Sequence, residues 1–518
     1  MSILTVKNMN HGFGDRAIFE DVSFRLLKGE HVGFIGANGE GKSTFMNIIT
    51  GNLMPDEGEI KWSNKVRVGY MDQHIVLEKG KTIRDILKDA FKYLFDLEEE
   101  MINITDKMGE ASPEELEKLL EDMGNIQDLL DNNDFYTIDA KIEEVSGGLG
   151  IKDVGLDRDV TELSGGQRTK VLLAKLLLEK PDILLLDEPT NYLDEEHIEW
   201  LKRYLQAYEN AFILISHDIP FLNSVINIIY HVDNKKLTRY VGDYDNFLRI
   251  YEANKKQLEA AYRRQQQEKE KLEDFIARNK ARISTTGRAK SRQKVLDKME
   301  MIELPQEKPK PEFNFKTARA SGKVIFETTD LVIGYTEPLS KPLNLRMERG
   351  QKIALRGANG LGKTTLLKSL LGDIKSISGK VYRGEYQYVG YFEQEGSKDN
   401  RNTCIEEFWK EFPGFTQYEV RAALAKCGLT TKHIESKVMV LSGGEQAKVR
   451  LSKLINRETN ILILDEPTNH LDVDAKEELK RALKEYKGSI LLVSHEPEFY
   501  EDIVTDVWDC ESWSTKIV

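Results

Sequence analysis

The sequence is poor in residues that cross-link a chain or anchor it in a membrane. It has 518 residues but only 3 cysteines, Cys404, Cys427 and Cys510, and none belongs to a CxxC pair. This argues against a disulfide framework and against a zinc site. No apolar run approaches the roughly 18 residues of a membrane span, and the first residues, MSILTVKNMNHGFG, are typical of a strand and not of a signal peptide. We therefore expect a cytoplasmic protein.

The chain has fewer cationic than acidic side chains, with 74 lysines and arginines against 87 acids and a net charge of −13. An acidic chain does not bind nucleic acid through its overall charge, so any such contact needs a local basic segment. The length predicts two to four domains, and each half is long enough to bury its own core.

The most informative feature is a duplication. The first copy reads GANGEGKST, VGYMDQ, LSGGQ, LLLDEPTNYLD and ISHD, and the second reads GANGLGKTT, VGYFEQ, LSGGE, LILDEPTNHLD and VSHE. In both copies the lysine of the first motif lies 31 positions before the glutamine of the second. The LSGG serine lies 23 positions before the DEPT aspartate, and the DEPT glutamate 29 before the histidine. Because the spacings agree to the residue, the sequence indicates two functional copies of the same module.

The pattern GxxxxGK[ST] after an apolar strand predicts a loop whose backbone N–H groups face phosphates at a helix start. Lys42 and Lys363 would supply charge to the β- and γ-phosphates of ATP, and Ser43 and Thr364 a hydroxyl to Mg²⁺. A single such pattern can be a mere glycine-rich turn, but here every partner motif occurs twice. The expected nucleotide-binding residues are Gly36, Asn38, Gly39, Gly41, Lys42, Ser43 and Thr44 in one loop and Gly357, Asn359, Gly360, Gly362, Lys363, Thr364 and Thr365 in the other.

Each DEPT motif follows four apolar residues, as expected of a strand buried on both faces. Such a strand brings Asp187 and Asp465 to the metal side at its carboxyl end. The next residues, Glu188 and Glu466, are then placed to orient or deprotonate the attacking water.

The LSGG and DEPTN motifs and the downstream histidine make both halves resemble the ATPase domains of the ABC superfamily. Two such domains in one chain, joined by a charged helical linker, resemble the ABC-F family, and the resemblance covers nearly the whole chain. In ABC ATPases the LSGG loop of one domain caps the nucleotide held by the other. The resemblance therefore implies two composite ATP sites: Lys42, Ser43, Gln73, Asp187, Glu188 and His217 with Ser442, Gly443 and Gly444, and Lys363, Thr364, Gln394, Asp465, Glu466 and His495 with Ser164, Gly165 and Gly166.

The same resemblance assigns Mg²⁺ to Ser43, Gln73, Asp187, Thr364, Gln394 and Asp465. The adenine-stacking aromatic of the family falls at Phe13 and Tyr335, although either ring could merely pack. The second LSGG loop continues with Glu445 where the first has Gln167. Both copies keep the glutamate that acts on water, so we expect both sites to function, but not necessarily at equal rates.

Comparison of the copies reveals an insertion in the first, near 94–135, that has the pattern of two short helices. By count it holds fourteen acids against Lys107 and Lys118, a net of −12. Ser112-Pro113-Glu114-Glu115 is a helix start. Such an acidic arm would be repelled by nucleic-acid phosphates. A basic protein is its expected partner, and a plain solvated helical face is the alternative.

The segment 243–315 between the copies predicts a helical hairpin, interrupted at 283–287 and returning through Val295, Leu296, Met299 and Ile302. Between Arg278 and Lys298 there are eight lysines or arginines against Asp297. Such a run is often only a solvated face, but this one suits contact with a phosphate backbone. The expected contacts are Arg278, Lys280, Arg282, Arg288, Lys290, Arg292, Lys294 and Lys298.

In ABC-F proteins this linker reaches into the ribosome from the tRNA exit site and contacts the P-site tRNA. The resemblance thus implies a translation factor that binds when ATP closes the domains and leaves after hydrolysis, relieving either stalling or antibiotic inhibition. A DNA-structure or repair ATPase and a soluble regulator of a membrane complex are the alternatives. A transporter is disfavoured because the chain lacks membrane helices.

The expected fold class is α/β, with two tandem P-loop ABC ATPase domains joined by an α-helical hairpin. We place the first domain at 1–242, the linker at 243–315 and the second domain at 316–518. Because one chain holds both halves of the ATP sandwich, we expect a monomer.

Overall fold

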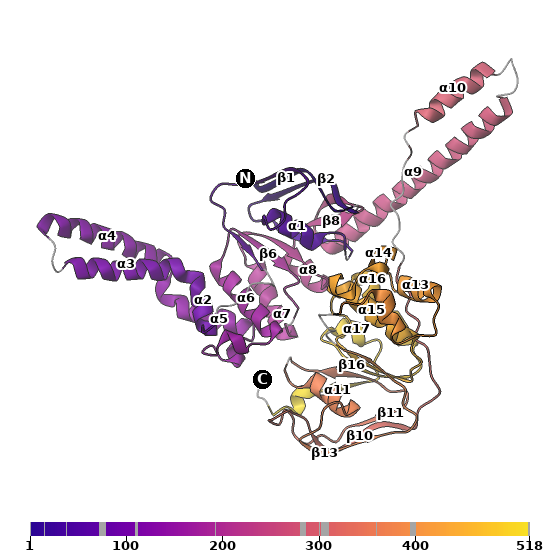
Figure 1. Cartoon of the computed structure of the whole chain (residues 1–518). Coiled ribbons are helices and arrows are strands. Elements are labelled where there is room, and N and C mark those ends of the chain that lie inside the picture. The colour runs from indigo at the N-terminus through magenta and orange to yellow at the C-terminus, as the bar shows by residue number, and fades with distance from the viewer. Residues whose placement is uncertain are drawn as a thin grey trace.

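A computed structural model gives the arrangement of the chain in space (Figure 1). It describes all residues except 1, 15, 38, 72–78, 109–111, 192, 280–285, 300, 302–309, 359, 394–399 and 516–518. Two α/β domains lie next to each other, and two helical pairs project from the first domain in different directions. None of the described helices is both long and apolar enough to span a bilayer.

The first domain is built on a mostly parallel sheet with the strand order β5-β6-β7-β3-β8-β9, in which only β9 is antiparallel. Its strands are β3 (His31–Ile35), β5 (Val68–Tyr70), β6 (Ile183–Asp187), β7 (Ala211–Ile215), β8 (Ile228–Asp233) and β9 (Lys236–Val241). Strands β6 and β7 are apolar almost throughout because helices cover both faces of such a sheet. A second, antiparallel sheet has the order β2-β1-β4 and contains β1 (Ser2–Phe13), β2 (Arg16–Leu27) and β4 (Glu57–Trp62).

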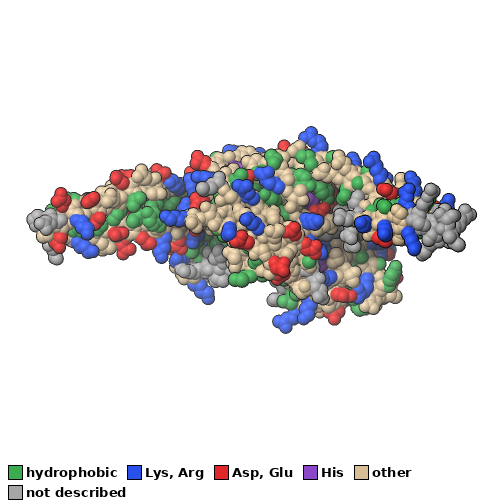
Figure 2. All heavy atoms as spheres, turned by 90° about the horizontal axis from the view of Figure 1, so that it is seen from above, with side chains coloured by type: hydrophobic (Ala, Val, Ile, Leu, Met, Phe, Trp, Pro, Cys, Tyr) green, Lys and Arg blue, Asp and Glu red, His purple; other side chains and the backbone are tan. Residues whose placement is uncertain are grey.

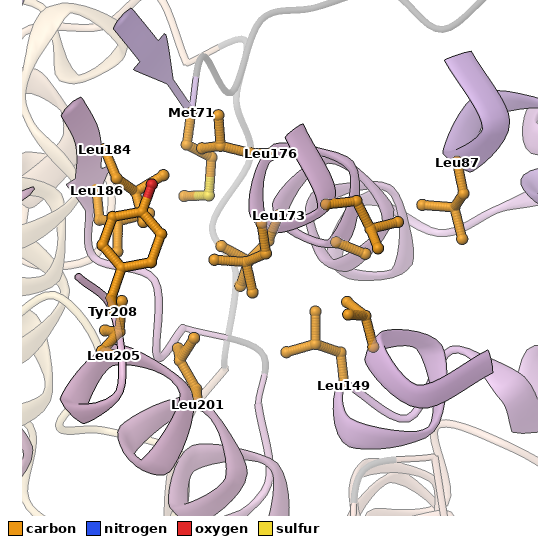
Figure 3. Packing of buried hydrophobic residues seen from close by; sticks show 14 of the residues in the cluster. Met71, Leu87, Leu149, Leu173, Leu176, Leu184, Leu186, Leu201, Leu205 and Tyr208 are labelled. Atoms are coloured by element: carbon orange, nitrogen blue, oxygen red, sulfur yellow. The ribbon is translucent and has the colours of Figure 1, made fainter. Parts of the chain in front are cut away.

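The helices of the first domain pack on the parallel sheet or on the helices that cover it. They are α1 (Lys42–Ile49), α2 (Ile83–Lys88), α5 (Ile138–Gly148), α6 (Gly165–Glu179), α7 (Glu195–Gln206) and α8 (Ile219–Val225). Figure 3 shows the core on one side of the sheet, where Leu184 and Leu186 of β6 meet leucines of α6 and α7. Leu87 and Leu149 continue this core to α2 and the end of α5, so the helical part that carries LSGG is joined to the part that contains the parallel sheet by buried apolar contacts.

The second domain repeats this plan with the parallel order β14-β15-β16-β12-β17 and an antiparallel sheet β11-β10-β13. Its strands are β10 (Val324–Val332), β11 (Arg346–Glu348), β12 (Lys352–Arg356), β13 (Ser378–Arg383), β14 (Val389–Phe392), β15 (Ile461–Asp465), β16 (Ser489–Val493) and β17 (Asp506–Asp509). Its helices are α11 (Lys363–Leu371), α12 (Cys404–Trp409), α13 (Gln417–Lys426), α14 (Thr431–Glu435), α15 (Gly443–Asn456), α16 (Val473–Glu485) and α17 (Pro497–Tyr500). The predicted fold class, two tandem α/β domains joined by a helical hairpin, is confirmed.

The insertion of the first domain forms an arm of two antiparallel helices, α3 (Lys92–Met108) and α4 (Pro113–Asn132) (Figure 1). With 17 and 20 residues they are longer than the short helices that we expected. The predicted start of α4 is correct: Ser112 and Glu115 form a capping box, and Pro113 occupies the first turn. The helices bury Leu94, Ile104, Ile126 and Leu130, while most of their described acids are exposed.

The linker is a hairpin of α9 (Tyr244–Asn279) and α10 (Thr286–Asp297). The base of α9 is anchored by Phe247, whose ring packs on Tyr240 and Tyr251. Helix α10 begins at Thr286, inside the predicted interruption, and ends at Asp297, earlier than expected. After Asp297 the chain tightens into a turn, in which Met299 N–H donates to Leu296 C=O (3.1 Å). Ile302 lies outside the described residues.

The hairpin returns to the second domain through Phe313, which is fully buried beneath α16. The backbone N–H of Phe313 donates to Glu478 Oε1 (2.7 Å), and Arg481 donates to the Phe313 carbonyl (3.1 Å). The start of the second domain is therefore held by one buried ring and two hydrogen bonds.

We predict that Phe313→Ala destabilises the second domain by about 3–5 kcal/mol, because it removes a ring from a core and leaves a cavity. Chemical denaturation followed by a probe in the second domain measures this loss. Tyr93→Ala, at a ring that is 59% exposed, is the control and should leave the transition unchanged. Equal stability of the two variants would show that the segment around Phe313 does not belong to the domain core.

Candidate functional site

The phosphate loop of each domain joins a parallel strand to a helix. In the first domain it connects β3 to α1, and in the second it connects β12 to α11. Gly41 and Gly362 precede these helices with φ values of 100° and 90°, which favour glycine. At Gly41 a Cβ atom would lie 2.4 Å from Ile18 Cγ2, so a side chain there would strain both the backbone and the packing.

The loop lysines are buried and bound to their own loops. Lys42 Nζ donates to the carbonyls of Gly36 (2.7 Å) and Ala37 (3.2 Å). Lys363 makes the same two bonds in the second domain, at 2.6 and 3.0 Å. Burial lowers the pKa of both lysines. Each ammonium group therefore lies where the loop would bring phosphate oxygens to it.

The hydroxyl that follows each lysine contacts the DEPT aspartate. Ser43 Oγ donates to Asp187 Oδ2 (2.8 Å), and Thr364 Oγ1 donates to Asp465 Oδ2 (2.7 Å). Burial raises the pKa of Asp187, and it raises the pKa of Asp465 to about 6. Oδ1 of Asp465 is buried and accepts no hydrogen bond from the described residues. A hydroxyl beside an undersatisfied carboxylate fits a Mg²⁺ ion bound with a nucleotide.

Within the described residues, no group of three or more His, Cys, Asp or Glu side chains is placed to hold a metal.

The DEPT glutamates lie at strained turns directly after the buried strands. Glu188 has φ 49° and Glu466 has φ 48°, both in the left-handed region. Their backbone N–H groups donate to Ile215 C=O (2.9 Å) and Val493 C=O (3.0 Å) of the neighbouring strand. These bonds hold the turns and direct both carboxylates towards the histidines that follow β7 and β16.

The two glutamate–histidine pairs differ in geometry. In the second domain, His495 Nε2 lies 3.2 Å from Glu466 Oε1 and 3.0 Å from Lys363 Nζ, and Asn469 donates to Glu466 Oε2 (2.6 Å). In the first domain, His217 Nε2 lies 3.7 Å from Glu188 Oε1. The His217 backbone N–H donates to Glu188 Oε2 at 3.3 Å. Glu466 is thus held by closer contacts than Glu188.

The pKa values of the two glutamates move in opposite directions. Burial, together with the charge of Asp187, raises the pKa of Glu188 to about 8. Burial also pushes the pKa of Glu466 upward, but the hydrogen bond with His495 and the charges of His495 and Lys363 outweigh it, so this pKa lies below its usual range. Burial and the charges of Lys42 and Lys476 lower the pKa of His217 to about 3.

The LSGG serines are the N-caps of α6 and α15. Ser164 accepts a hydrogen bond from Gln167 N–H (3.3 Å), and Ser442 accepts one from Glu445 N–H (3.4 Å). Both serines are exposed. Gly165, Gly166, Gly443 and Gly444 form the first turns of these helices, whose N-termini are suited to a phosphate.

The predicted adenine-stacking rings are exposed, Phe13 by 51% and Tyr335 by 69%. The rings are therefore not buried in the core, and a base can reach them. Asn38, Gln73, Asn359 and Gln394 lie outside the described residues, as do Lys280 and Arg282 of the hairpin; Arg288 lies in α10, but its side chain is not described.

Residues of the second domain that sequence reasoning missed lie near the first site. The charges of Asp472 and Lys476 act on His217, and that of Lys476 also acts on Glu188. Asp472 caps α16 and pairs with Lys448 at 2.7 Å. At the second site, the charge of Asp194 from the first domain acts on Lys363. The sequence difference that could have revealed Lys476 lies after DEPTN, where Lys476 occupies the position of Ile198 in the first copy.

Two phosphate-loop domains, each with an aspartate beside the loop hydroxyl and a glutamate–histidine pair, define a tandem ATP-binding protein of the ABC class. The family model described as ABC transporter matches residues 19–191 and 340–469, and a second model with the same description matches 230–315, which contains the hairpin.

The chain is 76% identical to the uncharacterized ABC transporter ATP-binding protein YfmM of Bacillus subtilis over the full length of both chains. It is 35% identical to ABC transporter F family member 2 of Arabidopsis thaliana, over 97% of this chain and 75% of that one. The chain therefore belongs to the F family of ABC ATP-binding proteins, whose domains are ATPase domains.

The fold is shared with a solved structure, the archaeal ribosome recycling factor aABCE1 in complex with the ribosomal stalk protein aP1. The TM-score is 0.57 at 21% identity, covering 97% of this chain and 87% of that one. At this level of identity the likeness concerns the fold alone.

We predict opposite effects on stability for the two Glu→Gln variants without nucleotide and with Mg²⁺ chelated. Folded Glu188 keeps a proton that the unfolded chain releases above pH 4.5, so its contribution to stability falls as pH rises to about 8. Glu188→Gln should therefore raise the free energy of unfolding at pH 8.5 by roughly 1–3 kcal/mol and have little effect at pH 5.

Glu466 has a lowered pKa, so its ionised form stabilises the folded state above pH 4.5, and this is lost as pH falls below that value. Glu466→Gln should lower stability at pH 8.5 by about 1 kcal/mol. Denaturation curves at pH 5, 7 and 8.5 measure both effects. The same sign for both variants at pH 8.5 would contradict the prediction.

Proposed function

We propose that this protein is an ATP-hydrolysing translation factor in the cytoplasm. As a monomer it binds the ribosome near the tRNA exit site while ATP holds its two domains closed. Its hairpin then contacts P-site tRNA or ribosomal RNA, and the protein leaves after hydrolysis. Its task would be relief of stalling or of antibiotic inhibition. The observation that carries this proposal is a stiff, basic hairpin on an otherwise acidic member of the F family.

In each proposed site, the loop lysine and the N–H groups of the phosphate loop bind the β- and γ-phosphates. Ser43 with Asp187, and Thr364 with Asp465, would hold Mg²⁺ together with Gln73 and Gln394. Glu188 and Glu466 orient or deprotonate water, and His217 and His495 position them. Phe13 and Tyr335 stack on adenine, a contact that their exposure permits.

The composite arrangement is supported by the charges that cross the domain boundary, Asp472 and Lys476 at the first site and Asp194 at the second. Gly443 lies against His470, which is two residues before Asp472. Because the charge of Asp472 acts on His217 of the first site, the second LSGG loop lies on the side of the second domain that faces the first site. ATP bound between the two faces favours the closed state by its higher affinity for it. Closure is thus the step that ATP controls.

The hairpin is long and is held together by contacts between its two helices. Helix α9 has 36 residues and is therefore about 54 Å long at 1.5 Å per residue. Leu272 and Ile276 are buried against α10, and the Arg292 guanidinium lies 5.6 Å from the centre of the Phe275 ring. Lys290, Lys294 and Lys298 are exposed. These contacts stiffen the hairpin and leave its cations available to phosphates.

The acidic arm carries a net charge opposite in sign to that of the hairpin. Figure 2 shows acidic side chains along the arm at one end and lysines and arginines on the hairpin at the other. A basic ribosomal protein is the partner that this arm fits, because RNA phosphates would repel it. The archaeal protein that shares the fold is a ribosome recycling factor by its printed description, which is an analogy at the level of the fold.

We predict that the double variant Glu188→Gln/Glu466→Gln co-sediments with 70S ribosomes in ATP and not in ADP, because the closed state forms but is not released by hydrolysis. Lys42→Ala/Lys363→Ala is the matched control, since it should lose nucleotide binding and remain in the supernatant. If the glutamine variant binds ATP yet stays in the supernatant, the translation factor is excluded and branched DNA becomes the substrate to examine.

We predict that Lys290→Gln/Lys294→Gln/Lys298→Gln weakens ATP-dependent ribosome binding about 10-fold or more at 150 mM salt and lowers the log–log salt slope by roughly 2–3, since each phosphate contact contributes about 0.7–0.9. Lys28→Gln/Lys236→Gln/Lys487→Gln removes the same charge from exposed positions elsewhere and should retain the slope. If both triple variants behave alike, the hairpin cations are a solvated face.

A further inference from the structure

An arginine and two tyrosines form an exposed stacked group on the second domain. The Arg319 guanidinium lies 3.9 Å from the ring centre of Tyr386 and 5.7 Å from that of Tyr388. Tyr386 is 55% and Tyr388 42% exposed. Flat aromatic and guanidinium surfaces that remain in water are the kind on which proteins stack nucleobases. We refer to Arg319, Tyr386 and Tyr388 as the stacking platform.

The backbone beneath the stacking platform is held by a buried side chain. Asn460 is 4% exposed, and its Nδ2 donates to the carbonyls of Arg319 (2.8 Å) and Tyr386 (2.7 Å). Its Oδ1 accepts from Tyr388 N–H (2.9 Å). One asparagine thus binds all three residues and joins the segment after the hairpin to the turn before β14. A platform fixed in this way loses little entropy when it binds a ligand.

The first domain has the same turn without the tyrosines. Lys65 and Arg67 occupy the positions of Tyr386 and Tyr388, and Asp182 that of Asn460. Lys65 and Tyr386 both have a left-handed φ, 64° and 59°. At such a position glycine or asparagine costs less than tyrosine. The turn therefore does not require Tyr386, and neither does the ATP-binding chemistry that the two domains share.

The charge around the stacking platform fits nucleic acid. The two segments that carry the stacking platform, 316–323 and 380–388, contain five lysines or arginines, Lys316, Arg319, Lys323, Lys380 and Arg383, against the single acid Glu385, and the paired strand adds Glu327 opposite Tyr382. The chain as a whole has a net charge of −13, so these two segments are opposite in sign to the chain as a whole. Cations beside exposed rings can bind phosphates while the rings bind bases.

We propose that the stacking platform is a second RNA-binding site, which stacks one or two unpaired bases of single-stranded RNA on Tyr386, Tyr388 and Arg319. The inference rests on the proposed function in taking RNA as the partner, and it adds a contact by the second domain that is separate from the hairpin. It concerns bases, whereas the hairpin contacts concern phosphates.

The test measures binding of the full chain to a fluorescent ten-nucleotide single-stranded RNA of mixed sequence and to an abasic oligonucleotide with the same backbone. Tyr386→Gly/Tyr388→Ala should weaken binding of the base-containing RNA on the order of 10-fold or more. Binding of the abasic strand should not change, nor should the salt slope, because no phosphate contact is lost. Tyr386→Gly suits the left-handed turn, so the variant should fold.

Two controls make the result specific. Tyr386→Phe/Tyr388→Phe keeps the rings and should bind within about 3-fold of the unmodified chain. Tyr418→Ala removes a tyrosine of the same domain that is 81% exposed and should have no effect. Equal affinities of the glycine–alanine variant and the unmodified chain for the base-containing RNA would overturn the proposal, as would an equal loss on the abasic strand. Ribosome co-sedimentation is measured in a separate experiment. A negative result for the stacking platform therefore does not decide whether the protein is a translation factor.

Discussion

The ATP-binding chemistry depends on one constraint of topology, which is that three loops must emerge from the same edge of a parallel sheet. In the first domain β3, β7 and β6 are neighbours in that order, and their carboxyl ends carry the phosphate loop, His217 and Asp187–Glu188. The hydrogen bond from Ser43 to Asp187 connects the outer two loops (2.8 Å), and Thr364 to Asp465 repeats it (2.7 Å). Placing carboxylates at the end of buried strands removes them from water, which raises the pKa of Asp187, Asp465 and Glu188.

Both copies keep this arrangement of loops, but the groups around the DEPT glutamate differ between them. Asn469 and His495 both contact Glu466, so its ionised form is stabilised. Glu188 has a longer contact with His217, and its charge is opposed by Asp187. The cation that acts on Glu188 from the other domain is Lys476, whose position in the first copy is occupied by Ile198. The two sites therefore differ in electrostatics although their motifs are almost identical: among the described residues, the cation Lys476 of the second domain acts on the first site, and the acid Asp194 of the first domain acts on the second.

What the sequence predicts well are features that local chemistry determines. The phosphate loops, the buried DEPT strands and the start of α4 at Ser112 follow from glycine geometry, apolar runs and capping. The roles of Asp472 and Lys476 could not be predicted in this way, because they depend on how one domain faces the other. The end of α10 at Asp297 was also missed. Val295 and Leu296 continue the apolar spacing, yet Val295 is 50% exposed, and periodicity alone does not reveal whether a partner surface exists.

The length of α9 has an electrostatic consequence. The arm contributes a net charge of −12 and the segment from Arg278 to Lys298 a net of +7, and the two lie at opposite ends of the molecule (Figure 1). At physiological ionic strength, charges are screened beyond about 8 Å, whereas α9 extends about 54 Å at 1.5 Å per residue. The acids of the arm and domains therefore do not cancel the potential near the hairpin cations. A polyanion meets the hairpin as a positive surface and the arm as a negative one, so the molecule is oriented before contact. A shorter linker with the same residues would hold the cations within the screening distance of the acidic domains and lose this effect.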